Sequence, residues 1–73
     1  MYKVLLRFRF MKDNSVIETY FDSRLSFKEN FQMLEIEDSS NLKIYDETKG
    51  LFLNTDIPIS QFNISYFMCF QVF

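Results

Sequence analysis

The sequence predicts one small α+β domain, in which a mixed sheet of four to five strands packs on a single helix. Three observations lead to this prediction: an alternating apolar pattern opens the chain, a capping box with a helical apolar stripe follows it, and strand-like runs separated by turn residues fill the rest. With 73 residues the chain is expected to form one domain over residues 1–73, of a size that requires a dense core. Ten Phe and four Tyr supply that core, because aromatic rings bury large apolar areas.

The first two strands are predicted to form a hairpin. Residues 2–11 alternate with period two, as expected of a half-buried strand. The predicted inward residues are Val4, Leu6, Phe8 and Phe10, and the outward residues are Lys3, Leu5, Arg7 and Arg9. A polar turn at residues 12–15 leads to a β-branched and aromatic run at residues 16–21. In this second strand the inward residues are Ile17, Thr19 and Phe21, and the outward residues are Glu18 and Tyr20.

A helix is predicted to begin after Ser26. The run Ser26-Phe27-Lys28-Glu29 has the capping-box pattern, in which the Ser26 hydroxyl and the Glu29 carboxylate each accept a bond from the other residue's backbone N–H. Phe27, Phe31 and Leu34 recur at helical spacing and form one apolar stripe, with Lys28, Glu29, Gln32 and Glu35 on the remaining surface. The helix is expected to end by the turn-forming run at residues 38–41.

The last part of the chain predicts a hairpin, a helical turn and a final strand. Residues 42–45 and 51–53 read as strands around a loop at 46–50, and Gly50 stands where such a loop most often needs a positive φ. Pro58 fits the first position of a short helical turn, because it lacks the N–H that would be unpaired there. In the run at residues 66–73 the favoured inward residues are Met68, Phe70 and Val72, and the outward residues are Phe67, Cys69 and Gln71. A slip of one residue would reverse the two sets.

Composition argues against an enzyme and against a bound cofactor or metal. The chain has no His and a single Cys, so one chain can build neither a disulfide framework nor a Cys/His metal site. It also lacks paired carboxylates on a rigid element, a Gly-rich loop and any nucleophile–base pair. Cys69 has no cationic cluster adjacent to it in the sequence and is interpreted as a small apolar residue. Glu35, Glu37 and Asp38 are interpreted as a solvated helix end, and not as a metal site.

Charge and hydropathy favour a cytoplasmic protein that does not insert into a membrane. The N-terminal run interleaves charges with apolar residues, unlike the apolar core of a signal peptide, and nowhere do 18 apolar residues follow one another. A formal net charge of −2 gives no long-range attraction for nucleic acid, which usually requires a basic domain or stripe.

The segment Pro58-Ile59-Ser60-Gln61-Phe62-Asn63-Ile64 resembles the connection that precedes the last strand in ubiquitin-like β-grasp domains. The resemblance extends over nearly the whole chain, from Val4 to Val72. It implies that the final strand inserts beside the first strand and that the helix covers one face of the sheet.

Ubiquitin itself and the related sulfur carriers act through a C-terminal Gly-Gly, whereas this sequence ends in Phe70-Gln71-Val72-Phe73. The resemblance therefore implies no conjugation and no sulfur carriage. Ubiquitin's main binding patch also includes an apolar residue in its third strand, and the matching residue here is Lys43. We expect that ubiquitin receptors do not recognise this chain.

Among relatives without Gly-Gly, the chain resembles the bacterial YukD-like family of type VII secretion loci. The start of the helix carries this resemblance, in Leu25-Ser26-Phe27-Lys28-Glu29-Asn30-Phe31. It implies a cytoplasmic accessory or regulatory protein beside a secretion machine.

The predicted working surface is the face of the sheet that the helix leaves uncovered. Its candidate residues combine apolar and cationic groups, as interfaces do; they are Leu5, Arg7, Arg9, Tyr20, Lys43 and Phe67. The expected partner is another protein or a second copy of this chain. An alternative function is binding of single-stranded nucleic acid by the same Arg and Tyr residues. A plainer interpretation of the cations is that they keep an exposed sheet face soluble.

Overall fold

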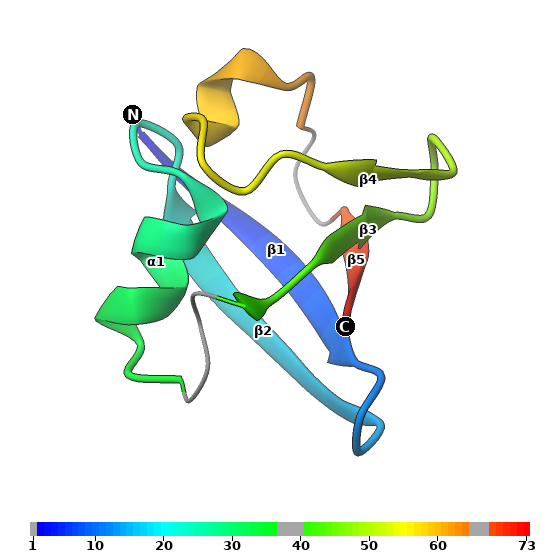
Figure 1. Ribbon diagram of the computed structural model, residues 1–73. Helices are drawn as coiled ribbons and strands as arrows, with labels where there is room; N and C mark the ends of the chain where they lie inside the picture. Colours follow the sequence, from blue (N-terminus) through cyan, green and yellow to red (C-terminus); the bar gives the residue numbers. More distant parts are fainter. Residues whose placement is uncertain (1, 37–40, 65–67) are drawn as a thin grey trace.

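The computed structural model describes residues 2–36, 41–64 and 68–73, and within them one α-helix packs on a five-stranded sheet (Figure 1). In chain order the elements are β1 (Lys3–Phe10), β2 (Ser15–Asp22), α1 (Phe27–Met33), β3 (Ile44–Asp46), β4 (Leu51–Leu53), the 3-10 turn η2 (Ile59–Gln61) and β5 (Cys69–Val72). This is the predicted order of elements. No helix of the described residues is long and apolar enough to cross a lipid bilayer.

The sheet is mixed, and its strand order is β2-β1-β5-β3-β4. β5 runs parallel to β1 and antiparallel to β3, and both hairpins are antiparallel. The last strand therefore lies between the first and third strands, so the predicted internal position of β5 is confirmed. This arrangement is the β-grasp topology.

The predicted faces of the strands are confirmed where the structure describes them. In β1, Leu6 and Phe8 are fully buried while Arg7 and Arg9 are exposed. Phe21 of β2 is buried and pairs with Val4. In β5 the buried residues are Phe70 and Val72, and Met68 packs partly buried against the same core, so the register favoured from the sequence is the observed one.

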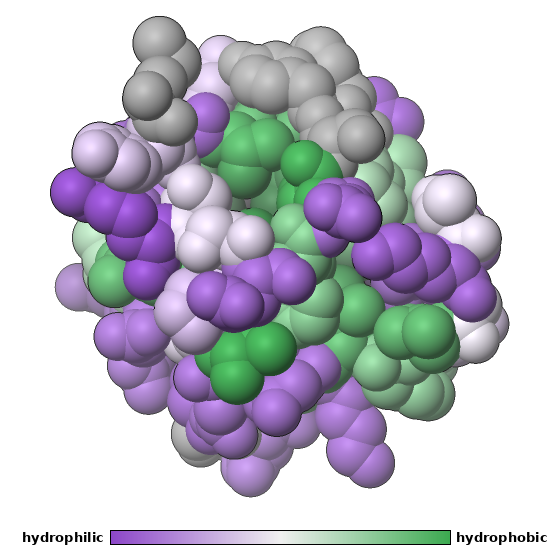
Figure 2. Space-filling model, turned by 90° about the horizontal axis from the view of Figure 1, so that it is seen from above, coloured by the Kyte–Doolittle hydropathy of each residue, from purple (hydrophilic) through white to green (hydrophobic). Residues whose placement is uncertain are grey.

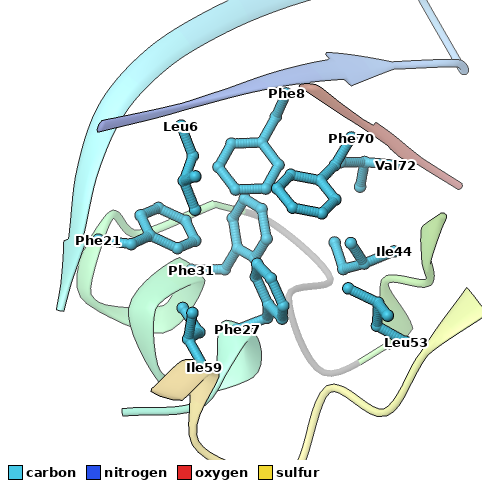
Figure 3. Close-up of a cluster of buried hydrophobic side chains, with 10 residues drawn as sticks. All are labelled: Leu6, Phe8, Phe21, Phe27, Phe31, Ile44, Leu53, Ile59, Phe70 and Val72. Carbon is cyan, nitrogen blue, oxygen red and sulfur yellow. The ribbon is translucent and has the colours of Figure 1, made fainter. Parts of the chain in front are cut away.

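The core lies between α1 and the sheet and is dominated by Phe side chains (Figure 3). The ring of Phe8 lies at its centre, with ring centroids 4.7 Å from Phe21, 5.0 Å from Phe31 and 5.6 Å from Phe70. Phe27 contacts Phe70 edge-on at 5.5 Å. The Phe8–Phe70 contact is stacked and the contacts of Phe8 with Phe31 and of Phe27 with Phe70 are edge-to-face, both of which are favoured geometries of aromatic pairs.

The capping box at the start of α1 is confirmed. The Ser26 Oγ accepts from the Glu29 backbone N–H at 3.1 Å, and Glu29 Oε1 accepts from the Ser26 N–H at 3.0 Å. The predicted apolar stripe is only partly right, because Phe27 and Phe31 are buried while Leu34 is 41% exposed. α1 ends at Met33, well before the predicted stop, and Leu34 is its C-cap. Glu35 then has φ +57°, the left-handed conformation that commonly follows the end of a helix.

The buried polar residue of α1 is Asn30, which connects the helix to the end of β2. Its Oδ1 accepts from the Asp22 N–H at 2.8 Å, and its Nδ2 donates to the Asp22 carbonyl at 3.0 Å and to the Ser26 carbonyl at 2.8 Å. One side chain thus satisfies both backbone groups of Asp22, which is what a neighbouring strand would do.

The second hairpin differs from the prediction at Asp46, which was expected in the loop and instead ends β3 as a fully buried residue. Its Oδ1 accepts from the N–H groups of Thr48 and Lys49 at 2.9 and 3.2 Å, which explains why a carboxylate is tolerated there. Gly50 has φ +69°, as predicted for this turn, and its N–H donates to the Asp46 carbonyl at 2.8 Å.

The short helical turn is confirmed, although its start is shifted by one residue. Pro58 is the N-cap of η2 with ψ 142°, and the helical residues begin at Ile59. Ile59 is buried in the core, and two backbone bonds, Ile59 N–H to the Leu25 carbonyl and Ser60 N–H to the Ser23 carbonyl, attach η2 to the chain before α1.

Candidate functional site

The two faces of the sheet differ in what covers them. α1 packs on one face, and no helix of the described residues covers the opposite face (Figure 1). We call this helix-free side the outer face. By strand alternation and pairing register, its described strand residues are Lys3, Leu5, Arg7, Arg9, Val16, Glu18, Tyr20, Asp22, Tyr45, Phe52, Cys69 and Gln71.

One row of the outer face crosses all five strands. The registers place Arg9 opposite Val16 and Gln71, Gln71 opposite Tyr45, and Tyr45 opposite Phe52. At a spacing of about 4.8 Å between strands, this row extends over about 19 Å. A cation and two aromatic rings therefore share one line across the sheet.

The aromatic end of the row forms an exposed cluster, which we call the aromatic corner: Tyr45, Phe52 and Phe73. Ring centroids are 5.1 Å apart for Tyr45 and Phe52, and 5.7 Å apart for Phe52 and Phe73. Phe52 is 56% exposed, and Phe73 is exposed to a similar degree. The corner is thus a contiguous apolar surface that the fold leaves in water.

Cations lie beside the aromatic corner. Lys43 and Phe73 exchange backbone bonds, Lys43 N–H to Phe73 O at 3.0 Å and Phe73 N–H to Lys43 O at 2.9 Å, so Lys43 lies directly opposite Phe73. Arg7 binds Glu18 Oε1 at 3.2 Å in an exposed ion pair. Arg9 and Lys43 make no ion pair with any residue that the structure describes.

Cys69 is half-buried, as expected of the small apolar residue that the sequence indicated, but cations lie beside it on the neighbouring strand. The parallel register places Cys69 opposite Arg7, and both line a hollow of about 160 Å³ together with Arg9, Val16, Glu47 and Phe70. The cationic neighbours come from β1, far away in the sequence, which is why no adjacent cluster was visible there. The predicted outward direction of Cys69 is consistent with its half-buried state.

The predicted surface residues fall into separate groups. Leu5 lies opposite Tyr20 across the β1–β2 pair, and it is half-buried while Tyr20 is exposed. Arg7 and Arg9 follow Leu5 along β1. Lys43 belongs to the opposite end of the face, level with residue 11, about 20 Å along the strands from Leu5. Phe67 lies outside the described residues.

The aromatic corner was not among the predicted surface residues. Its signal was present in the second hairpin, because once Ile44 and Leu53 point inward, Tyr45 and Phe52 must point outward on adjacent strands. The missing information was the antiparallel register, which places the two rings directly opposite one another.

Two other hollows lie elsewhere on the molecule. A hollow of about 490 Å³ opens at the hairpin end of the inner face, with apolar walls that include Phe10, Ile17 and Ile36. A second, of about 280 Å³, lies near η2 and is lined by Val4, Ile59 and Phe62 among others. Figure 2 views that end of the molecule, where apolar side chains show between polar ones. The described residues that line these two hollows include no His, no Cys and no pair of carboxylates.

Solved structures with the same fold include two ubiquitin-like proteins. A protein designed de novo on the basis of ubiquitin aligns with a TM-score of 0.76 and 11% identity, over 99% of this chain and 88% of that chain. The ubiquitin-like domain of an Arabidopsis thaliana protein aligns with a TM-score of 0.76 and 16% identity, over 100% of this chain and 78% of that chain. No protein-family model and no curated protein matches the sequence. The fold is therefore the ubiquitin-like β-grasp.

Proposed function

We propose that this protein is a non-catalytic interaction module that binds a partner protein through the outer face of its sheet. The observation that carries the proposal is the aromatic corner beside Arg9 and Lys43. Exposed aromatic rings and Arg side chains are enriched in the centres of protein interfaces. These rings are not members of the buried core cluster, so packing of the core does not account for their presence.

The charge of the outer face favours a partner that presents carboxylates. The whole chain has a formal net charge of −2. Among the described residues, however, the outer face with adjoining Lys43 and Glu47 carries four cations against three carboxylates: Lys3, Arg7, Arg9 and Lys43 against Glu18, Asp22 and Glu47. Opposite charge on the partner would steer its approach and set its orientation.

At a finer level, we propose that the protein is an accessory or regulatory component of a bacterial type VII secretion system. The support is the resemblance of its helix start to the YukD-like family, together with the ubiquitin-like fold. In that setting the partner would be a cytoplasmic part of the secretion machine.

Charge reversal on the outer face tests the proposal. We expect the double variant Arg9→Glu, Lys43→Glu to fold normally, because both side chains are exposed and neither has an ion-pair partner among the described residues. A matched double variant, Lys12→Glu, Lys49→Glu, makes the same change of charge in two exposed turns. Quantitative mass spectrometry of proteins co-purified from the source cells should show partners lost at least tenfold with the first variant and retained with the second.

A neutral substitution separates charge from apolar contact. Phe52→Ser should also weaken capture of the same partners, since it removes the most exposed ring of the corner. If both outer-face variants retained every partner of the wild type, the outer face would not be the working surface. Binding of a labelled single-stranded oligonucleotide, abolished by Arg9→Glu, Lys43→Glu, would instead favour the nucleic-acid alternative.

A further inference from the structure

The strand β2 forms an unusually open edge of the sheet. It is the outermost strand on its side and runs for eight residues, whereas β4 at the other edge has three. Long edge strands are normally protected by charged side chains, above all Lys, by Pro, by a bulge or by a covering segment. β2 contains neither Pro nor Lys, its charged residues are Glu18 and Asp22, and its eight residues pair with β1 without a bulge.

The outward backbone groups of β2 belong to its even-numbered residues. Ser23, just after β2, donates its N–H to the carbonyl of Tyr2, just before β1, at 2.7 Å, so the odd-numbered residues of β2 direct their backbone N–H and carbonyl groups toward β1. Asp22 accordingly directs its N–H and carbonyl away from β1, where Asn30 binds both. Val16 and Glu18 direct theirs the same way, and no described residue binds them.

We propose that this edge pairs with β2 of a second copy of the chain, antiparallel, with the two-fold axis at Ile17. In this register Val16 lies opposite Glu18 of the second copy and Glu18 lies opposite Val16 of the second copy. The free N–H and carbonyl groups of the two residues in each copy then form four hydrogen bonds across the axis. Residues that lie opposite each other across the axis direct their side chains to the same side of the sheet. The sheets of the two copies therefore become one continuous sheet.

Neighbouring registers are less favourable for reasons visible in β2. Moving the axis to Glu18 places two Glu18 carboxylates directly opposite one another, which is destabilising. Moving it to Thr19 brings Asp22 opposite Val16, and Asn30 already occupies the edge groups of Asp22. Moving it to Val16 pairs Glu18 with Asn14, which lies in the turn with φ +59°.

Side chains on both faces fit the axis at Ile17. On the outer face Arg9 lies directly behind Val16, so Glu18 of the second copy comes within reach of a cation that has no described ion-pair partner. Glu18 uses only its Oε1 for Arg7, which leaves the other oxygen for this contact. On the inner face the half-buried Ile17 covers Ile17 of the second copy.

The helix leaves room for the second strand. Asn30 binds β2 at Asp22, the end away from the hairpin turn, and Ile17 lies toward the turn. Figure 1 shows the β1–β2 hairpin extending beyond α1. An added strand opposite residues 15–19 therefore meets a sheet edge that no described helix or strand covers.

Disulfide trapping tests the register, in a Cys69→Ala background that removes the native thiol. Residues on the axis form a non-hydrogen-bonded pair with Cα atoms about 4.5 Å apart, within the range that a disulfide bridges. Thr19→Cys is the matched control, because it lies on the same strand and face but about 14 Å from its copy in this register. We expect Ile17→Cys to cross-link at least tenfold faster than Thr19→Cys under mild oxidation. Equal or slower cross-linking of Ile17→Cys overturns the proposal.

Sedimentation velocity tests the pairing without a cross-link, over concentrations up to about 1 mM, where weak dimers form. Val16→Glu places two carboxylates opposite each other and should weaken dimerisation at least tenfold. The monomer should stay folded, because Val16 is 48% exposed and adjacent to Arg9. Leu51→Glu is the matched control on the other edge, at a residue with 46% exposure, and should leave the dimer unchanged. A wild-type chain that stays monomeric throughout, or a dimer insensitive to Val16→Glu, overturns the proposal.

Discussion

The two faces of the sheet use the same strands for different purposes. On β1, Phe8 is fully buried against four Phe rings, while its neighbours Arg7 and Arg9 are exposed on the outer face. Aromatic rings occur on both faces, but those of the core cluster on the inner face are fully buried, whereas Phe52 and Phe73 of the aromatic corner are 56% and 50% exposed. Substitution of an inward residue of a strand should therefore affect mainly stability, and substitution of its outward neighbour should affect mainly binding.

The faces also differ in how they treat polar groups. Asn30, on the buried side, makes hydrogen bonds with three backbone groups: the N–H and carbonyl of Asp22 and the carbonyl of Ser26. Asp46 is the exception there, because its Oδ2 is buried with no hydrogen-bond partner among the described residues. On the outer face the polar groups are solvated, and an exposed ion pair such as Arg7–Glu18 contributes only about 0.2–1 kcal/mol. Polar substitutions should therefore be costly on the inner side and mild on the outer side.

The sharpest test of this contrast compares two Phe residues. We expect Phe8→Ala to lower the free energy of unfolding by about 3–5 kcal/mol, because it opens a cavity among Phe21, Phe31 and Phe70. Phe52→Ala should change it by less than about 1 kcal/mol, since its ring is largely in water. Chemical denaturation followed by circular dichroism measures both. Comparable losses in the two variants would mean that the aromatic corner is a structural cluster.

A loss that large approaches the whole stability of a small domain. Phe8→Leu keeps most of the side-chain volume and serves as the folded companion variant. Its unfolding free energy should lie between those of the wild type and Phe8→Ala.

The second prediction concerns the buried amide. Asn30→Ala should lower the free energy of unfolding by about 1–3 kcal/mol, because it leaves the N–H and carbonyl of Asp22 without their partners. Gln32→Ala, on the exposed side of the same helix, is the control and should have little effect. Amide hydrogen exchange at Asp22 should become faster in Asn30→Ala alone. Unchanged exchange would show that Asn30 does not hold the end of β2.

The third prediction concerns the start of the helix. Ser26→Ala removes the hydroxyl that accepts from Glu29 N–H and should cost about 0.5–2 kcal/mol of unfolding free energy. Binding through the outer face should be unaffected, since the cap belongs to the other side of the sheet. A denaturation midpoint equal to that of the wild type would show that the cap contributes nothing to stability.

Local chemistry made much of the fold predictable. The capping box, the alternation of β1 and the positive φ of Gly50 each depend on residues close together in the sequence. Leu34 and Asp46 were misplaced because their environments depend on where the chain turns: Glu35 ends the helix early, and Thr48 and Lys49 donate to Asp46. Periodicity alone contains neither turn.

The candidate surface was less predictable than the core, because it is assembled from distant strands. Arg7 and Arg9 were visible from the alternation of one strand. Their proximity to Cys69, and the contact of Tyr45 with Phe52, required the order and register of the sheet. A single sequence gives which side of a strand a residue is on, and the pairing of strands gives its neighbours.

The smallest expected effect concerns an exposed ion pair at the end of β2. The Arg24 guanidinium, followed by the Arg24 backbone N–H, lowers the pKa of Asp22 to about 2; an unperturbed Asp has a pKa of about 3.9. Because the folded-state pKa is the lower one, the ionised pair contributes stability above about pH 4, and this contribution is lost as the pH falls toward about 2. Arg24→Ala should raise the pKa of Asp22, measured by NMR titration of its carboxyl carbon, and should flatten the fall of the unfolding free energy in this window. Asp13 is the internal control, because bonds from the Ser15 hydroxyl and N–H lower its pKa independently of Arg24. An Asp22 that titrates near pH 4 in the wild type would show that the Arg24 contact does not persist in solution. Exposed ion pairs at this edge of the sheet would then contribute even less to stability than the comparison of the two faces implies.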